Sequence, residues 1–136
     1  MINTKDMIFV FGSNIKGIHG AGAAAYARKH KGAILGIGEG PQGMSYALPT
    51  MGLGLGPKKG FEKLHTGNIK FYVDRFTEYA MFRPDLKFQV TQVGCGLGGH
   101  KKEDIAPLFK MAPINCYFDE AWESILGDEF EYWGTF

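Results

Sequence analysis

Two glycine clusters constrain the fold of this chain more than any other feature. One reads "HGAGAAA" over 19–25 and the other "VGCGLGGH" over 93–100; each lies between an apolar run and a run typical of a helix. Glycine is unfavourable inside helices and strands, but it allows tight turns and close approach of the main chain. The clusters therefore predict two loops that each connect a buried strand to the start of a helix.

Further short apolar runs alternate with helical patterns along the whole chain. The strands that these runs predict cover 7–11, 33–37, 44–49, 87–93 and 114–118. The predicted helices cover 22–31, 69–80, about 102–110 and 119–126, and Pro107 leaves the extent of the third one open. The clearest helix has one apolar stripe, formed by Ile69, Val73, Phe76 and Ala80.

Strands that alternate with helices predict an α/β protein, a three-layer α/β/α sandwich with a mainly parallel central sheet. A length of 136 residues fits one domain that spans 1–136. The chain holds 20 glycines, about twice the roughly 7% of an average protein, and they gather in loops without a fixed period. This distribution argues against collagen-like and low-complexity sequences.

Charge and cysteine content exclude several classes of function. The formal net charge is only +1, which favours neither a nucleic acid nor an anionic membrane as partner. The apolar run 7–11 is too short to span a bilayer and lacks the pattern of a signal peptide. Cys95 and Cys116 show neither a disulfide framework nor metal-ligand spacing. We therefore expect a cytoplasmic protein with reduced thiols, no metal and no cofactor; its oligomeric state stays open.

The position of the two loops predicts an anion site. In a parallel sheet, loops that follow strands emerge at the carboxyl edge, where α/β proteins usually bind ligands. Main-chain N–H groups in glycine loops and at helix N-termini bind phosphates. The alternative is that the glycines serve only tight turns and close helix–sheet contacts. Neither cluster has the lysine of a Walker loop or the spacing of a dinucleotide fingerprint.

The residues around both clusters resemble those of a known family. The first cluster follows an asparagine in the order Asn14, four residues, His19, Gly20, one residue, Gly22, and the second reads "GCGLGG". Together they resemble the binding loops of the macro domain. A closer likeness, over most of 7–126, is to small phage and bacterial proteins with "FGSN", "SYALPT", "GCGLGG" and "EDIAPLF", which look like a compact branch of that superfamily.

The resemblance implies a macro-domain-like fold with a pocket for a small-molecule ligand of the ADP-ribose type. The implied catalytic residues are Asn14, which would orient the distal ribose, and His19, which would handle a proton near neutral pH. The main chain at 20–22 would hold one phosphate and that at 96–98 the other. The candidate ligand-binding residues are Gly12, Ser13, Gly20, Ala21, Gly22, Gly94, Cys95, Gly96, Leu97, Gly98, Gly99 and His100.

Several of these residues have an alternative role in the fold. Asn14 is also suited to cap its own loop, and His19 to bond a main-chain group. Cys95 lies between two glycines before a helix, a place that can stabilise a nucleophilic thiolate, and packing is its alternative role. The aromatic ring that macro domains place against the distal ribose is replaced here by Gly98, which leaves His100 and Tyr46 as substitutes.

Two further parts of the chain have no fixed role. The loop 51–60 is either a lid, with Lys58 and Lys59 reaching phosphate, or a plain connection. The adenine-binding aspartate of macro domains has no counterpart among the residues before Asn14. Three functions stay open: a hydrolase of a terminal phosphate or ADP-ribose ester, a non-catalytic reader or sponge for such a ligand, and a structural phage protein.

Overall fold

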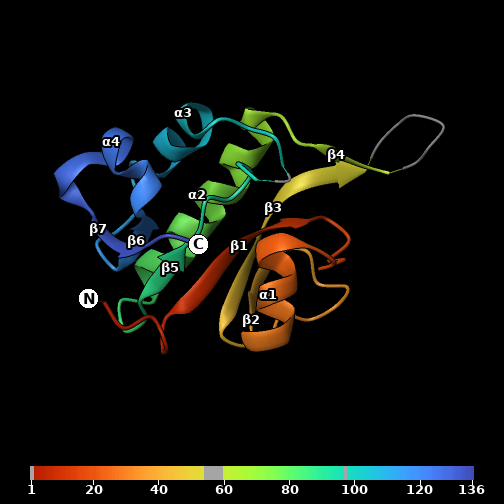
Figure 1. Ribbon diagram of the computed structural model, residues 1–136, viewed down its shortest axis with the longest axis horizontal. Coiled ribbons are helices and arrows are strands. Elements are labelled where there is room, and N and C mark those ends of the chain that lie inside the picture. Colours follow the sequence, from red (N-terminus) through yellow and green to blue (C-terminus); the bar gives the residue numbers. More distant parts are fainter. Residues whose placement is uncertain (1, 54–59, 97) are drawn as a thin grey trace.

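The computed structural model describes residues 2–53, 60–96 and 98–136 (Figure 1). Within these residues seven strands form one sheet in the order β2-β3-β1-β5-β6-β7, with β4 paired to β3. The strands are β1 (Ile8–Asn14), β2 (Gly40–Gln42), β3 (Ser45–Leu53), β4 (Phe61–Lys63), β5 (Phe88–Val90), β6 (Cys116–Asp119) and β7 (Glu131–Gly134).

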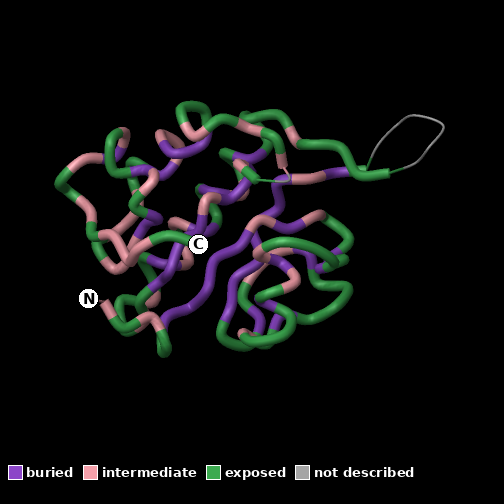
Figure 2. The backbone as a smooth tube through the Cα atoms, viewed as in Figure 1, coloured by how far each residue is buried: buried purple, intermediate pink, exposed green. Residues whose placement is uncertain are grey.

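The sheet is mainly parallel. β1 pairs in parallel with β3 and β5, and β6 pairs in parallel with β5 and β7. Only β2 and β4 run antiparallel to their neighbour β3 among the described strands. Buried residues dominate β1, β3 and β5, as expected for strands covered on both faces (Figure 2). The predicted α/β/α architecture is therefore confirmed.

Helices cover both faces of the sheet. The helix α1 (Gly22–His30) packs through Ala24 and Ala27 against Phe9 and Phe11 of β1. The alternate β1 residues Ile8 and Val10 point to the opposite face, into the larger core. That face holds α2 (Thr66–Phe82), α3 (Lys102–Ile105), α4 (Glu123–Leu126) and the 3-10 turns η1 (Ala106–Phe109) and η2 (Glu120–Trp122). A third 3-10 turn, η3 (Gly127–Glu129), follows α4.

The predicted helix stripe is confirmed, and one helix is shorter than predicted. Ile69, Val73, Phe76 and Ala80 are all fully buried on α2. The predicted helix at 102–110 ends as α3 at Ile105 and continues as the 3-10 turn η1. Pro107 has no N–H to donate to the carbonyl group four residues earlier, so the α-helical pattern cannot continue through it.

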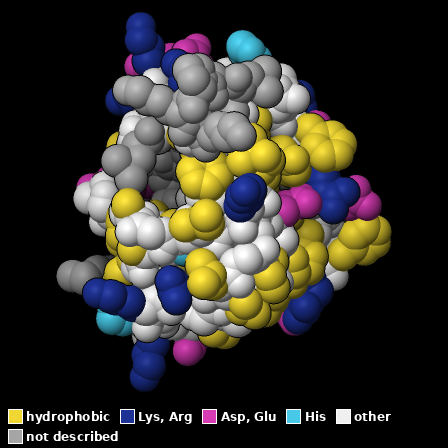
Figure 3. Space-filling view, turned by 90° about the vertical axis from the view of Figure 1, so that its right-hand side faces the viewer, with side chains coloured by type: hydrophobic (Ala, Val, Ile, Leu, Met, Phe, Trp, Pro, Cys, Tyr) yellow, Lys and Arg dark blue, Asp and Glu magenta, His cyan; other side chains and the backbone are white. Residues whose placement is uncertain are grey.

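The strand predicted at 33–37 is wrong. Ile34, Leu35 and Ile37 are exposed, and the segment forms a loop and a turn. Its main chain is bound by the Gln42 side chain, which accepts from the Ile34 N–H at 2.7 Å and donates to the Ile37 carbonyl at 3.1 Å. The Gln42 side chain thus forms hydrogen bonds of the kind that a neighbouring strand would supply. The loop lies at the right of Figure 1, on the face where Figure 3 shows hydrophobic side chains gathering.

Most other boundaries shift by a few residues. β1 extends through Gly12 to Asn14, and β3 runs to Leu53, where it pairs with β4. The predicted loop 51–60 is therefore a strand at its first residues, and Lys58 and Lys59 lie outside the described residues. The helix predicted at 119–126 is replaced by η2 followed by α4. In the described ranges no helix is long and apolar enough to cross a membrane.

Candidate ligand-binding site

A cleft lies at the carboxyl ends of β1, β3 and β5, beside the first turn of α1. Its volume is about 500 Å³, within the range typical of small-molecule sites. The lining residues are Gly12, Ser13, Asn14, Ala21, Gly22, Ala23, Ala24, Thr50, Met51, Thr91, Gln92, Val93, Gly94, Cys95, Gly96, Gly98 and Phe136. The structure thus brings both glycine clusters to one cleft.

Glycine is required at several of these positions. Gly94 has φ +76°, a left-handed conformation that side chains rarely adopt. A Cβ atom at Gly98 would lie 2.7 Å from the carbonyl oxygen of Gly94, so only glycine fits this turn. At Gly12 a Cβ atom would lie 3.2 Å from Thr50 Oγ1 and 3.3 Å from the Gly94 nitrogen. These glycines allow the second loop to pack closely against the end of β1.

The start of α1 presents main-chain donors to the cleft. Its N-cap residue is Ala21, whose side chain cannot accept a hydrogen bond, and its first turn has no acidic residue. The first helical bond runs from the Ala25 N–H to the Ala21 carbonyl at 3.2 Å. The N–H groups before it have no intrahelical acceptor, and the helix dipole makes this end partly positive. This end of the cleft favours an anion.

The second loop presents donors as well. The N–H groups of Cys95, Gly99 and His100 donate to carbonyl groups within the loop at 3.1, 3.0 and 2.9 Å. Within the described ranges, those of Gly94 and Gly96 have no protein acceptor. No charged side chain is among the described residues that line the cleft. Attraction for an anion would therefore come from the main chain.

Asn14 lines the cleft and also caps its own loop. Its Nδ2 donates to the Ile18 carbonyl at 2.8 Å, and its Oδ1 accepts from the Ile18 N–H at 3.0 Å. A primary amide has a second N–H and a second lone pair. The side chain can therefore hold the loop and still offer one donor to a ligand.

His19 is placed away from the cleft lining. Its side chain is 2% exposed and packs edge-on against Phe11, with ring centroids 5.2 Å apart. Its Nε2 lies 3.0 Å from the carbonyl oxygen of Ile34, and no partner meets its Nδ1. This geometry corresponds to the main-chain-bonding alternative and gives no support to a catalytic role. The neighbouring Ser13 is buried and donates through Oγ to the Gly38 carbonyl.

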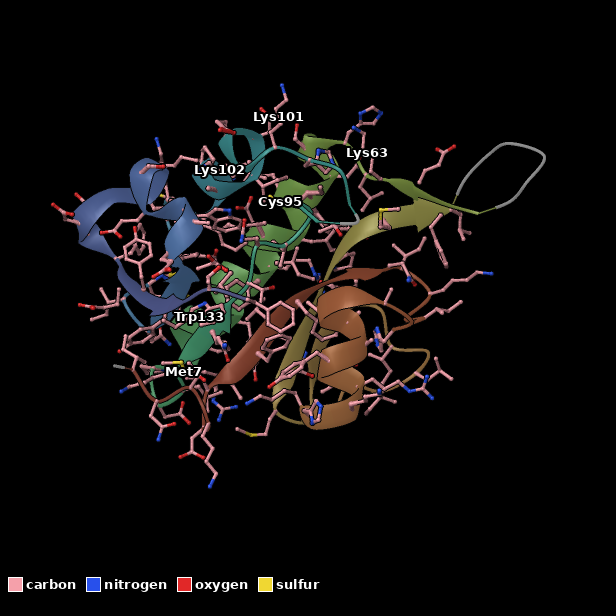
Figure 4. All side chains as sticks on the ribbon, viewed as in Figure 1. Met7, Lys63, Cys95, Lys101, Lys102 and Trp133 are labelled. Carbon is pink, nitrogen blue, oxygen red and sulfur yellow. The ribbon has the colours of Figure 1, made fainter. Side chains whose placement is uncertain are left out.

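Cys95 lines the cleft as a thiol. Burial, followed by the negative charge of Glu103, raises the pKa of Cys95 to about 11. At neutral pH the group is therefore almost wholly protonated, which makes it a poor nucleophile. Figure 4 shows Cys95 on the loop after β5, with Lys101 directed outward at the upper edge of the molecule.

The remaining residues predicted to bind ligand lie outside the cleft lining or outside the described residues. His100 is half-buried, and its Nε2 lies 2.8 Å from the carbonyl oxygen of Leu64, outside the cleft lining. Gly20 and Gly99 are exposed and do not line the cleft. Tyr46 is buried in the core on the opposite face of the sheet. The predicted residue Leu97 lies outside the described residues.

The sequence reading missed part of the lining. Thr50 and Met51 lie in β3, where Met51 pairs with Asn14 of β1, and the "SYALPT" run was the signal for this strand. Thr91 follows β5, and its Oγ1 donates to the Val10 carbonyl at 2.7 Å. Phe136 lies far from both clusters in sequence, and no local pattern marks it.

No metal centre emerges from this arrangement. In the part of the chain that the structure describes, no three His, Cys, Asp or Glu side chains are close enough together to hold a metal ion.

Comparison of the chain with protein families, curated proteins and solved structures gives no match. The functional interpretation therefore rests on the cleft itself.

Proposed function

We propose that the cleft binds a nucleotide ligand of the ADP-ribose type through main-chain amides. The observation that carries this proposal is that two segments with main-chain donors, the start of α1 and the loop residues 94–96 and 98, line one cleft. Main-chain donors that converge from two sides suit a diphosphate, because each phosphate then meets its own set of N–H groups. The resemblance to macro-domain loops supports the same ligand class.

Binding without turnover accounts for the cleft better than hydrolysis does. Acid–base catalysis requires a group that exchanges a proton near neutral pH. Among the described lining residues the only titratable side chain is Cys95, whose pKa is raised to about 11. His19 is buried and is not among the residues that line the cleft. We therefore propose a reader or sponge for the ligand rather than an enzyme that consumes it.

Gly96→Val tests this assignment. Apart from its neighbours in the chain, no atom of the described residues lies within 4 Å of a Cβ atom added at Gly96, so we expect the fold to accommodate valine, which then occupies space in the cleft. We expect isothermal calorimetry to show ADP-ribose binding to the wild type and a loss of at least about tenfold in affinity in the variant. ADP and NAD serve as comparison ligands, and a phosphorylated ADP-ribose serves as substrate in a turnover assay.

The matched control is Gly67→Val. Gly67 is exposed in the first turn of α2 and does not line the cleft. Apart from its own helix and chain neighbours, no atom of the described residues lies within 4 Å of a Cβ atom added there. We expect unchanged affinity in this control. Equal affinity in wild type and Gly96→Val would contradict the site, and turnover that is lost in His19→Ala would favour the hydrolase instead.

A further inference from the structure

The C-terminal segment forms part of the wall of the cleft. Phe136 lines the cleft, and Figure 1 shows the C-terminus beside β5 and β1. Three hydrogen bonds that involve side chains fasten this segment to the sheet. Trp133, labelled in Figure 4, donates its Nε1–H to the Val90 carbonyl at 2.9 Å. The Thr135 hydroxyl and the Phe136 N–H both donate to Asp119 Oδ2 at 3.1 Å.

Asp119 is the central anchor of this segment. Its side chain is fully buried at the end of β6, and no lysine or arginine of the described ranges pairs with it. Its other oxygen, Oδ1, accepts from the Ala121 N–H at 2.9 Å. Burying a carboxylate is costly unless hydrogen bonds compensate it. These donors therefore fix the segment in a defined position.

Phe136 packs against two other aromatic rings and also borders the cleft. Its ring centroid lies 5.6 Å from that of Phe9 and 5.3 Å from that of Tyr26, both in edge contacts. Phe136 as a whole is 56% exposed, and it is one of the residues that line the cleft. Tyr26 lies about one helical turn after Gly22, the first residue of α1. The Phe136 ring, which contacts Tyr26, therefore lies about one turn along α1 from the N–H groups at the start of this helix. The cleft thus has a donor-rich end and an aromatic wall.

We propose that Phe136 determines the specificity of the cleft for ligands that carry a heteroaromatic base, and that Asp119 is the residue that positions it. This inference rests on the proposed function. The phosphates of the ligand meet the amides of both glycine loops while its base packs on the exposed part of the Phe136 ring. The ligand class is then a nucleoside diphosphate, and a diphosphate without a base binds through the amides alone.

Calorimetry with two probes tests the role of the ring. ADP-ribose carries a base, whereas inorganic pyrophosphate, measured by competition, does not. We expect Phe136→Ala to weaken ADP-ribose binding about tenfold, as the loss of one base–aromatic contact predicts, while pyrophosphate affinity stays within about twofold. Phe136→Tyr keeps the ring and should bind ADP-ribose like the wild type. If pyrophosphate does not compete, the comparison of Phe136→Ala with Phe136→Tyr is used instead. ADP-ribose affinity that is lost in the alanine variant and restored in the tyrosine variant, at equal melting temperatures, would support the role of the ring, and affinity that stays low in the tyrosine variant would contradict it.

Thr135→Val tests the anchor. It removes one donor to Asp119 Oδ2 but leaves the bond from Ala121, so η2 keeps its cap. We expect a smaller loss, confined to ADP-ribose. Equal ADP-ribose affinity in wild type and Phe136→Ala would overturn this inference and leave the proposed function standing. Parallel weakening of both probes would assign the ring a structural role and also overturn it, whereas a wild type that binds neither probe rejects the proposed function itself.

Discussion

The two faces of the sheet are built from side chains of different size. The face covered by α2 buries the large rings of Phe76, Phe88, Phe109, Phe118 and Trp122. The face covered by α1 buries four alanines beside Phe9 and Phe11. Small side chains let α1 lie close to the sheet, so its first turn and the strand ends border the same cleft. We therefore expect the α2 face to contribute most of the stability, and the close packing of α1 to matter more for the shape of the cleft.

The largest effect is expected from Phe76→Ala on the α2 face. Phe76 is fully buried, and its ring centroid lies 5.0 Å from that of Tyr46 and 5.3 Å from that of Phe88. Loss of such a ring should lower the free energy of unfolding by about 3–5 kcal/mol, as measured by urea denaturation. A loss of unfolding free energy smaller than that of an α1-face variant would contradict the larger contribution of the α2 face to stability.

A smaller effect is expected from Ala27→Leu on the α1 face. Ala27 is fully buried, so the added methyl groups would push α1 away from β1. We expect a loss of about 1–3 kcal/mol in unfolding free energy, together with weaker ligand binding because the start of α1 moves. Arg28→Leu is the control, since Arg28 is exposed on the same helix. Unchanged binding in a destabilised Ala27→Leu protein would show that the cleft does not depend on this close packing.

The smallest effect is expected from Asn14→Ala at the rim of the cleft. The substitution removes the two hydrogen bonds between the Asn14 side chain and Ile18. Because the groups of Ile18 are exposed and can bond water, we expect a loss of about 1 kcal/mol, measured by thermal unfolding. A drop in ADP-ribose affinity beyond that in Ile18→Ala, which keeps both bonds, would show that Asn14 contacts the ligand directly.

Local patterns were sufficient for most of the fold. The α2 stripe follows directly from its spacing, because a helix has a fixed period and one buried face. The run 33–37 has the same apolar character as the true strands, yet no strand pairs with it. Whether an apolar run becomes a strand depends on a neighbour, and here Gln42 binds the main chain instead.

The position of the main chain at the site was predictable from the sequence, whereas the surroundings of its side chains were less so. Glycines that follow strands must lie at the carboxyl edge of a parallel sheet, and both clusters do line the cleft. The environment of His19 depends on Phe11 and on the loop that carries Ile34, which no spacing around the histidine encodes. Its burial therefore could not be read from the "HG" motif.

The alternation of strands and helices and the place of the two glycine loops follow from local patterns, because backbone preferences are largely a local property. Contacts made in the folded protein turn the His19 ring inward, let Asn14 close its own loop and bring Phe136 to the cleft. These outcomes depend on contacts between segments distant in sequence, above all the buried carboxylate of Asp119 that holds the end of the chain.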